Sequence, residues 1–423
     1  MKTLEQWLSF IEHLHSKSID MGLERMNQMI RKMNIKFDIP VFTVGGTNGK
    51  GSICSYLEHI LEAQGYKVGV HTSPHLLRFN ERAKINGKYV EDEEFIKYFE
   101  AVEKARGELT LSYFEYTLLA ILKLFQEKDL DAVILEIGLG GRLDAVNTVE
   151  PTVSIIASIG IDHTAFLGNT REEIAWDKAH IYRPNKPAIC GDKNPPDTLI
   201  SYAKDIGARL EVNGKDFEGI KTGAHSWNYS GPNWKLIDLP LPSMKGVYQI
   251  NNASAALAAL EAVEGQIKVD RSSIEEGLKK ALLSGRFQKI QDSPEIIVDV
   301  GHNPHAAVQL AETLKANPIQ GKTYAVFGML SDKDRQKVCA LMAPCASRWF
   351  LADLPGPRGG RAEELKEFLV KEGTPEADIR IFTSVREGLQ NALKTAQSTD
   401  RILVFGSFVT VSEALTALKV PVI

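Results

Sequence analysis

A glycine-rich stretch that also carries a lysine and a serine, VFTVGGTNGKGS at residues 41–52, has the composition of a phosphate-binding loop. It departs from the usual G-x-x-x-x-G-K-[ST] pattern, because Gly51 follows Lys50 directly and Val44 stands where the first glycine is expected. A strand, a glycine-rich turn and a helix in this order present backbone N–H groups and a helix dipole to phosphate oxygens. Lys50 would then reach the β- and γ-phosphates, and Ser52 would meet phosphate or magnesium. The alternative is a purely structural glycine turn.

Two neighbouring apolar strands are expected to deliver metal-binding side chains to one edge of a sheet. The strand in DAVILEIG carries Glu136, whose carboxylate would be costly to bury without a cation or hydrogen bonds. The strand in VSIIASIG leads directly to Asp162 and His163, at the carboxyl end where ligands gather in open parallel sheets. Magnesium bound with a nucleotide would account for both positions. A structural histidine is the alternative for His163.

Two further motifs carry reactive side chains but have simpler interpretations. Lys178 lies in the helical stretch REEIAWDKAHIYRP, where a solvated helix charge is the plain interpretation. The segment EIIVDVGHNPHA predicts a strand, a turn with Asp299, Gly301 and His302, and then a helix. Such a turn can bind a dinucleotide, but the G-x-G-x-x-G fingerprint is missing.

The elements that must position these residues follow an α/β pattern. Apolar runs of strand length alternate with helix-period stretches, which is typical of a mostly parallel sheet. Alternation around Asn86-Gly87 predicts a hairpin with a type I′ turn, and residues 210–245 are expected to form short strands and loops. The other strands expected in this part are 41–46, 66–72, 131–138 and 152–160, and the helices are 50–64, 92–106, 114–128 and 251–263.

A second alternating series begins after residues 282–295, which have no apolar period. Its strands are expected near 296–300, 323–328, 347–352, 379–383 and 401–406. We therefore predict two domains with a boundary near residue 290. Residues 1–290 form a phosphate-loop domain with a mostly parallel sheet, and residues 291–423 form a smaller, doubly wound, Rossmann-like domain.

Composition narrows the class of partner. The 423 residues include 50 basic and 54 acidic side chains, so the formal charge of −4 favours neither nucleic acid nor an anionic membrane. Small-molecule substrates are expected instead. The four cysteines are scattered, which indicates core thiols in a reducing compartment and not disulfides or a zinc site. No signal peptide or spanning segment is apparent, so a cytoplasmic location is expected.

Eight motifs in order give the chain a specific resemblance. GGTNGKGS, HTSPHL, SYFE, LEIGLGGRLDAVN, DHTAFLG, DKAHIYR, SGRFQ and DVGHNPHA resemble the bacterial bifunctional dihydrofolate synthase/folylpolyglutamate synthases of the Mur ligase superfamily. The resemblance extends from WLSFIEHLHSK near the start to VFGSFVTV near the end. In this family G-K-G-S is the usual form of the phosphate loop.

The resemblance implies an ATP-dependent ligase that adds L-glutamate to 7,8-dihydropteroate, giving dihydrofolate, and to tetrahydrofolate or folylpolyglutamates through an acyl phosphate. It also implies ATP and magnesium, with two ions expected, and a monomeric protein. Lys50, Lys178 and His163 would be the catalytic residues. A carbamylated Lys178 would support a second magnesium ion, although the usual E-K-A-G reads Asp177-Lys178-Ala179-His180 here.

The resemblance further implies three sets of binding residues. ATP would be bound by Asn48, Gly49, Lys50, Gly51, Ser52, Asn252, Arg286, Asp299 and His302. Magnesium would be bound by Ser73, Glu136, His163 and carbamylated Lys178. Dihydropteroate or folate would be bound by Ile19, Asp20, Met21, Ser112, Tyr113, Phe114, Glu115, Leu143, Asp144 and Ala145.

Competing interpretations differ by testable features. A ligase that makes only folylpolyglutamates lacks the dihydropteroate activity. A cell-wall-precursor ligase carries a UDP-sugar domain before the phosphate loop, whereas only 45 residues precede Gly46 here. A guanine-nucleotide switch needs N-K-x-D, and NKPA at 185–188 lacks the acid. A dehydrogenase needs the glycine fingerprint.

Overall fold

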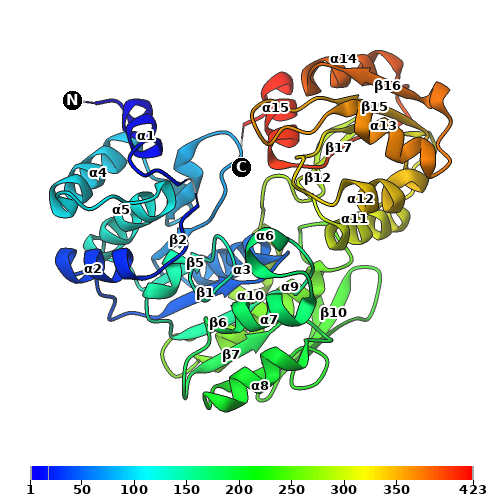
Figure 1. Cartoon of the computed structure of the whole chain (residues 1–423). Helices are drawn as coiled ribbons and strands as arrows, with labels where there is room; N and C mark the ends of the chain where they lie inside the picture. The colour runs from blue at the N-terminus through cyan, green and yellow to red at the C-terminus, as the bar shows by residue number, and fades with distance from the viewer. Residues whose placement is uncertain (1, 18, 422–423) are drawn as a thin grey trace. The chain divides into compact units, whose positions relative to one another are not determined.

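The structure, a computed structural model, describes residues 2–17 and 19–421 and divides into two compact units (Figure 1). The first unit comprises the described residues through Gly160, together with Ala165–Pro242 and Ile250–Ala281. The second comprises Ile161–Thr164, Ser243–Gln249 and the described residues from Leu282 onward. Each unit contains helices and a largely parallel sheet, which confirms the predicted fold class.

The main sheet of the first unit has eight strands in the order β4-β3-β2-β5-β1-β6-β7-β8. They are β1 (Val41–Gly45), β2 (Val68–His71), β3 (Ala83–Ile85), β4 (Lys88–Tyr89), β5 (Ala132–Glu136), β6 (Val153–Ile156), β7 (Pro187–Cys190) and β8 (Arg209–Val212). The strands from β2 to β8 in this order pair in parallel, and β3 and β4 are antiparallel. The hairpin turn has positive φ at Asn86 (50°) and Gly87 (71°), as the predicted type I′ turn requires.

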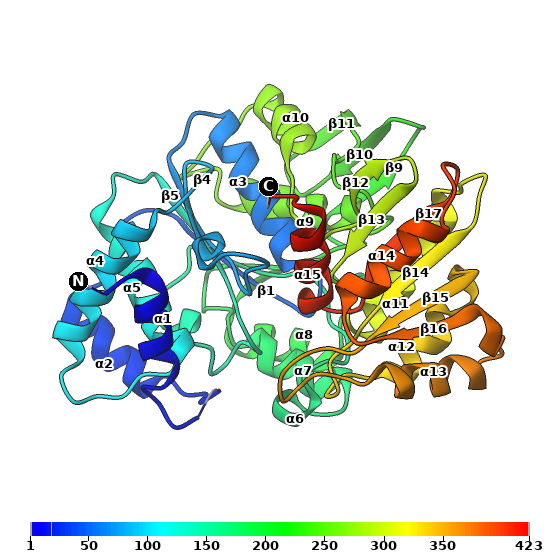
Figure 2. The ribbon, with the colours of Figure 1, turned by 90° about the horizontal axis from the view of Figure 1, so that it is seen from above.

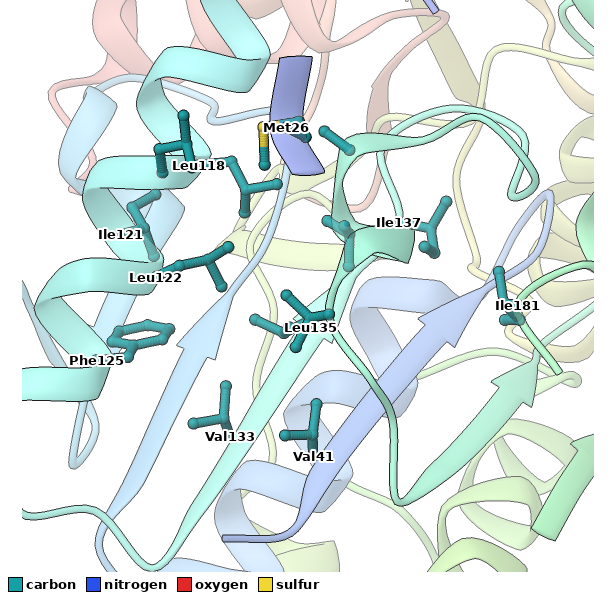
Figure 3. Packing of buried hydrophobic residues seen from close by; sticks show 14 of the residues in the cluster. Met26, Val41, Leu118, Ile121, Leu122, Phe125, Val133, Leu135, Ile137 and Ile181 are labelled. Atoms are coloured by element: carbon teal, nitrogen blue, oxygen red, sulfur yellow. The ribbon is translucent and has the colours of Figure 1, made fainter. Parts of the chain in front are cut away.

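Helices cover both faces of this sheet. They are α1 (Leu4–Glu12), α2 (Glu24–Met33), α3 (Lys50–Ala63), α4 (Asp92–Arg106), α5 (Tyr113–Glu127), α6 (Thr164–Leu167), α7 (Arg171–Ala179), α8 (Asp197–Asp205), α9 (Gln249–Ala262) and α10 (Arg271–Lys280). Helix α5 turns Leu122 and Phe125 toward Val133 and Leu135 of β5 (Figure 3). Because strand side chains alternate, Ile134 faces the opposite layer, where α3 packs against β1, β2 and β5.

A small antiparallel sheet, β11-β10-β9, occupies the region expected to hold short strands and loops. Its strands are β9 (Glu218–Lys221), β10 (Ser226–Ser230) and β11 (Lys235–Pro240). Trp227 and Tyr229 of β10 are fully buried, and the Tyr229 hydroxyl donates to Glu261 Oε2 of α9 at 2.8 Å. The sheet is therefore anchored to the alanine-rich helix.

The second unit is doubly wound, as predicted. Its six-stranded sheet has the order β12-β13-β17-β14-β15-β16, with only β12 antiparallel to its neighbour. The strands are β12 (Gln288–Asp292), β13 (Glu295–Asp299), β14 (Thr323–Phe327), β15 (Arg348–Ala352), β16 (Ile379–Phe382) and β17 (Arg401–Phe405). The helices are α11 (Pro304–Ala316), α12 (Arg335–Met342), α13 (Ala362–Lys371), α14 (Val385–Thr395) and α15 (Phe408–Leu418). Helices α11, α12 and α13 share one core with the sheet, and α14 and α15 pack together and against its strands (Figure 2).

The cysteines and the helix lengths can be described directly. All four cysteines are free thiols, and Cys54, Cys190 and Cys339 are buried. Among the described residues, no helix has the length and apolarity needed to cross a membrane.

Candidate active site

The glycine-rich loop connects β1 to α3 and has the backbone of a phosphate-binding turn. Gly46 and Gly49 adopt φ of 133° and 93°, values that favour glycine. A Cβ on Gly46 would lie 2.9 Å from the backbone nitrogen of Ala157, so this position also lacks room for a side chain. Lys50 begins α3 and donates from Nζ to the carbonyl oxygens of Gly46 at 3.2 Å and Thr47 at 3.3 Å. The lysine is thus held over the loop.

Asn252, one of the residues predicted to bind the nucleotide, lies against this loop. A Cβ on Gly49 would lie 2.6 Å from Asn252 Oδ1, so the amide fills the space that a side chain at this glycine would need. The loop is also tied to the segment after β6, because Thr47 Oγ1 donates to Gly160 O at 3.0 Å and Asn48 N donates to Ser158 Oγ at 3.2 Å. Gly51 and Ser52 are buried in the first turn of α3.

Glu136 ends β5 beside the loop, because Val44 of β1 pairs with it in register. Its carboxylate is 5% exposed, and its Oε2 accepts from the backbone N–H of Ser73 at 3.0 Å. The structure therefore brings together two of the expected magnesium ligands. A carboxylate and a serine hydroxyl are hard oxygen donors that suit Mg²⁺, which commonly takes one or two carboxylates together with substrate phosphates. Among the described residues, no group of three or more His, Cys, Asp or Glu side chains that could hold a metal occurs.

Lys178 is not a solvated helix charge. It lies at the end of α7, is 4% exposed and donates from Nζ to Gly46 O at 3.0 Å. The end of α7 also packs closely on the segment after β5, because Gly141 has no side chain: a Cβ there would lie 2.9 Å from Lys178 Cα. The departure at His180 has a structural account, since its backbone N–H caps α7 and its imidazole lies 2.7 Å from Trp176 O and stacks on Tyr202 with ring centroids 4.0 Å apart. His180 therefore packs against α8.

Three separate stretches expected to bind folate meet in the first unit. Arg25 Nε donates to both carboxylate oxygens of Glu115 at 3.0 and 3.1 Å, and Arg25 also forms a 2.6 Å ion pair with Asp20. The backbone N–H of Gly22 donates to Leu143 O at 3.3 Å. Residues 19–21, 112–115 and 143–145 are thereby linked.

The expected folate residues differ in accessibility. Ile19 is 42% exposed, Met21, Tyr113 and Phe114 are partly buried, and Glu115 is 2% exposed. Asp144 accepts from the backbone N–H groups of Leu139 at 2.8 Å and Val146 at 2.9 Å. Burial raises the pKa of Asp144 to about 6, although these hydrogen bonds oppose the shift. Ser112 caps α5, and Ala145 begins a short 3₁₀ helix, η2 (Ala145–Thr148).

The second unit brings together Arg286, Asp299 and His302. Asp299 is 6% exposed and accepts from the N–H groups of Phe287 at 2.8 Å and Gly301 at 2.7 Å. Burial raises the pKa of Asp299 and the nearby Arg286 charge opposes that shift. Arg286 lies over the Phe408 ring at 5.7 Å. The His302 ring is 6.1 Å from the same phenylalanine.

Asp162 and His163 also belong to the second unit. Asp162 accepts from Lys333 Nζ at 2.5 Å and from Asn303 Nδ2 at 2.9 Å, and its carboxylate is 3.4 Å from His302 Nε2. Burial alone would raise the pKa of Asp162, but the His302 hydrogen bond and the Lys333 charge hold it below its usual range. His163 follows with a φ of 52°, in the left-handed region that is uncommon for a residue other than glycine.

Sequence reasoning did not identify two charged residues that organise these groups. Arg25 and Lys333 are far in sequence from Glu115 and Asp162, the carboxylates that they pair with. No local motif surrounds either residue, so only a long-range contact prediction could have found them.

Comparison with known proteins gives consistent matches along the chain. Residues 44–260 match the Mur ligase middle domain, and residues 285–408 match the Mur ligase glutamate ligase domain. The dihydrofolate synthase/folylpolyglutamate synthase of Escherichia coli is 43% identical over 416 residues, covering 98% of this chain and 95% of that protein. The solved structure of E. coli FolC with DHPP and ADP is similar with a TM-score of 0.93 and 42% identity, covering 99% of this chain and 98% of that one. The Yersinia pestis bifunctional folylpolyglutamate synthase/dihydrofolate synthase with AMPPNP and Mn has a TM-score of 0.92 at 40% identity, with 99% of each chain covered.

Proposed function

Because the chain belongs to the Mur ligase family, and within it to the dihydrofolate synthase/folylpolyglutamate synthases, we propose that it uses ATP to join L-glutamate to folate-type acids. The acceptors are 7,8-dihydropteroate, which becomes dihydrofolate, and tetrahydrofolate or its polyglutamates. The observation that carries the proposal is sequence identity to the E. coli enzyme along nearly the whole chain, including the N-terminal stretch that contains Asp20.

The reaction has two steps that both bring anions together. The acceptor carboxylate attacks the γ-phosphorus of ATP, the bond to the bridging oxygen breaks, and ADP leaves as an acyl phosphate forms. The amine of L-glutamate then attacks the acyl carbon and loses a proton, and inorganic phosphate leaves through a tetrahedral intermediate. Cations and N–H donors should therefore dominate catalysis, and Lys50, whose Nζ is held over the phosphate loop by the carbonyls of Gly46 and Thr47, is such a cation.

The nucleotide and metal assignments are part of the same proposal. In the first unit, Asn48, Gly49, Gly51, Ser52 and Asn252 join Lys50 in binding ATP, and in the second unit Arg286, Asp299 and His302 keep the nucleotide role implied by family resemblance. Ser73, Glu136, His163 and carbamylated Lys178 would hold magnesium, with two ions expected. Magnesium bound there neutralises charge on the phosphate oxygens.

Acceptor binding is assigned to the stretches 19–21, 112–115 and 143–145. Arg25 links the first two, and the backbone N–H of Gly22 links the first to the third. The partly buried Asp20 is a carboxylate suited to the N–H groups of a pterin, and the partly buried Tyr113 and Phe114 rings suit a flat heterocycle. The buried Asp144 keeps the role implied by family resemblance. Glu115 contributes by holding Arg25, because its carboxylate is buried and already bonded.

The remaining assignments concern organisation and location. We assign residues 1–290 to the ATP-binding domain with the folate site and residues 291–423 to the smaller ligase domain, supported by family matches at 44–260 and 285–408. The protein acts as a cytoplasmic monomer without nucleic-acid partners. A formal charge of −4 supports the last point.

The decisive experiment measures phosphate release from ATP with magnesium and L-glutamate, using 7,8-dihydropteroate and tetrahydrofolate as alternative acceptors. Release with both, abolished in Lys50→Ala, is expected. Release with tetrahydrofolate alone would reduce the assignment to a folylpolyglutamate synthase and remove the dihydropteroate role of residues 19–21. Release with neither acceptor would contradict the proposed function and return attention to the cell-wall-precursor ligases.

A further inference from the structure

Arg82 is a buried cation that neither the sequence motifs nor the assignments above use. It ends the short 3₁₀ helix η1 (Phe79–Arg82), directly before β3, and is 9% exposed. Its guanidinium carbon lies 5.5 Å over the Tyr113 ring and 5.7 Å over the Phe79 ring. Its Nε donates to His75 Nδ1 at 2.9 Å. Arg82 thus lies between the segment that carries Ser73 and the stretch 112–115.

None of these neighbours supplies the negative charge that a buried guanidinium requires. The two rings offer only weak cation–π attraction, and an imidazole is at most a neutral acceptor. Within the described part of the chain, no carboxylate forms an ion pair with Arg82. A buried charge left without a counterion is strongly unfavourable, so this arrangement calls for an anion from outside the chain.

The nearest carboxylates are held in other ways. Glu81 accepts from the backbone N–H groups of Leu76 and Leu77 at 2.7 Å and of Arg78 at 2.6 Å. Glu136 accepts from Ser73 N and acts on Arg82 only through longer-range electrostatics. The guanidinium is therefore within electrostatic range of the expected metal carboxylate, in contact with an expected folate residue, and paired with neither.

We propose that Arg82 binds the carboxylate of the acceptor substrate, the group that becomes the acyl phosphate. This inference rests on the proposed function. A guanidinium matches a carboxylate with two parallel N–H donors, a geometry that lysine cannot reproduce. Its charge offsets the repulsion between the acceptor carboxylate and the ATP phosphates as the two approach. The Tyr113 face beside it suits the aromatic ring that carries the carboxylate in dihydropteroate.

Two other substrates offer similar oxyanions, namely the carboxylates of L-glutamate and the phosphates of ATP. The contact with Tyr113 favours the acceptor, and the test separates all three. Arg82→Lys keeps the positive charge but loses the two parallel N–H donors of the guanidinium, and Arg82→Gln removes the charge. Arg78→Gln is the matched control, because Arg78 precedes the same 3₁₀ helix but its side chain is exposed.

The primary measurement is calorimetric binding of 7,8-dihydropteroate and of its decarboxylated analogue to the full chain with ADP and magnesium. Both Arg82 variants should bind dihydropteroate about 10- to 100-fold more weakly, as for loss of a charge-assisted pair, with little change for the analogue or for ADP. The KM for acceptor should rise in parallel while the KM values for L-glutamate and ATP stay unchanged. Arg78→Gln should behave as the wild type.

Several outcomes would overturn the inference. Equal weakening of the analogue would make Arg82 a packing residue, and a rise confined to the KM of L-glutamate or ATP would assign it to that substrate. If the variants do not fold, the wild type still provides the test: it should bind the carboxamide of dihydropteroate at least 10-fold more weakly than dihydropteroate itself, and equal affinity would contradict the inference. Absence of wild-type turnover with either acceptor would instead refute the proposed function.

Discussion

At the scale of residues, two lysine side chains meet at a single backbone oxygen of the phosphate loop. Lys50 and Lys178 both donate to Gly46 O, at 3.2 and 3.0 Å, although they come from different helices. Arg82 adds a buried cation near Glu136. A reaction between a carboxylate and a triphosphate gains most from cations already in place, because no reorganisation is needed as charge develops.

Lys178 carries the first prediction, which concerns carbamylation. Because the side chain is 4% exposed, a carbamate formed on Nζ would be shielded from the water that hydrolyses it. We expect ¹³C NMR of protein equilibrated with labelled bicarbonate to show one carbamate signal that Lys178→Ala lacks. Depleting carbon dioxide should lower kcat reversibly, about 10-fold or more if the carbamate supports a metal.

Lys186→Ala is the matched control, since Lys186 follows the same helix but pairs with Glu150 near the surface. The carbamate signal should persist in that variant. A signal that survives Lys178→Ala, or activity indifferent to carbon dioxide, would show that Lys178 acts as an ammonium group.

At the scale of elements, α3 combines the phosphate loop with a pair of poorly matched carboxylates one turn apart. Glu58 is 2% exposed and its Oε2 lies 3.5 Å from Lys84 Nζ, and one oxygen of each of Glu58 and Glu62 is buried without a hydrogen bond. Burial, reinforced by Glu58, raises the pKa of Glu62 from 4.5 to about 7. The positive charge of Lys84 is therefore shared between the carboxylates of Glu58 and Glu62.

The second prediction follows from that raised pKa. The folded state holds a proton on Glu62 that the unfolded state releases above its ordinary pKa, so this contribution to stability is full below that value and lost as pH rises through about 7. Glu62→Gln should stabilise the protein at about pH 8 by about 1 kcal/mol, allowing for solvent screening, and change little at about pH 5. Thermal unfolding at both pH values measures this. Glu93→Gln, on the exposed side of α4, should have no such effect. If Glu62→Gln changes the stability equally at both pH values, the change does not come from the raised pKa of Glu62.

The third prediction concerns the helix that positions Lys178. Helix α7 begins with a capping box in which Thr170 Oγ1 accepts from Glu173 N at 3.2 Å and Glu173 Oε2 accepts from Thr170 N at 3.1 Å. Thr170→Ala should lower stability by about 1 kcal/mol and reduce kcat, because the first turn of α7 loses its cap. Thr170→Ser keeps the hydroxyl and should recover both. Denaturation and steady-state kinetics on the two variants decide the point, and equal losses in both would exclude the cap as the cause.

Local pattern predicts most elements, and its failures have physical reasons. The periodicity indicates a helix at 92–106, and α4 occupies Asp92–Arg106. Strand β12 escapes prediction because Ile290 is its only apolar residue and an edge strand needs little burial. Strand order is also beyond local pattern, because pairing between β1 and β5 joins segments about ninety residues apart.

Some residues of the candidate site can also be predicted from local pattern, and others cannot. The loop with Lys50 and the strand ending at Glu136 are local signals that need only a strand followed by a turn. The roles of Arg25 and Arg82 depend on their contacts with Glu115 and Tyr113, respectively. The periodicity of apolar residues does not predict such contacts. Long-range side-chain partners are therefore what the sequence alone could not supply.

At the scale of the whole molecule, the two units interleave along the chain. Ile161–Thr164 belongs to the second unit, although the residues on both sides of it belong to the first. The anchor is Asp162, which accepts from Lys333 Nζ at 2.5 Å across 171 residues of sequence. Both side chains are almost fully buried. The segment that carries His163 is thus fixed to the unit that carries Arg286, Asp299 and His302.

The fourth prediction tests this anchor. Lys333→Met removes the ammonium partner of a buried carboxylate and leaves it His302, Asn303 and the backbone N–H of His163, so it should destabilise the second unit by about 3 kcal/mol, as for a buried pair with one partner removed. Hydrogen exchange should accelerate at residues 161–164 while β1 and β5 stay protected. Asp162→Asn combined with Lys333→Met removes the uncompensated charge and should recover most of the stability.

The control for this anchor is Lys337→Met, because Lys337 lies on the exposed side of α12 and pairs with the neighbouring Asp334 at the surface. It should leave both stability and exchange unchanged. If Lys333→Met accelerates exchange throughout the second unit without singling out residues 161–164, Lys333 stabilises that unit as a whole. If the double variant is no more stable than Lys333→Met, the loss comes from packing around the lysine stem and not from the unpaired carboxylate.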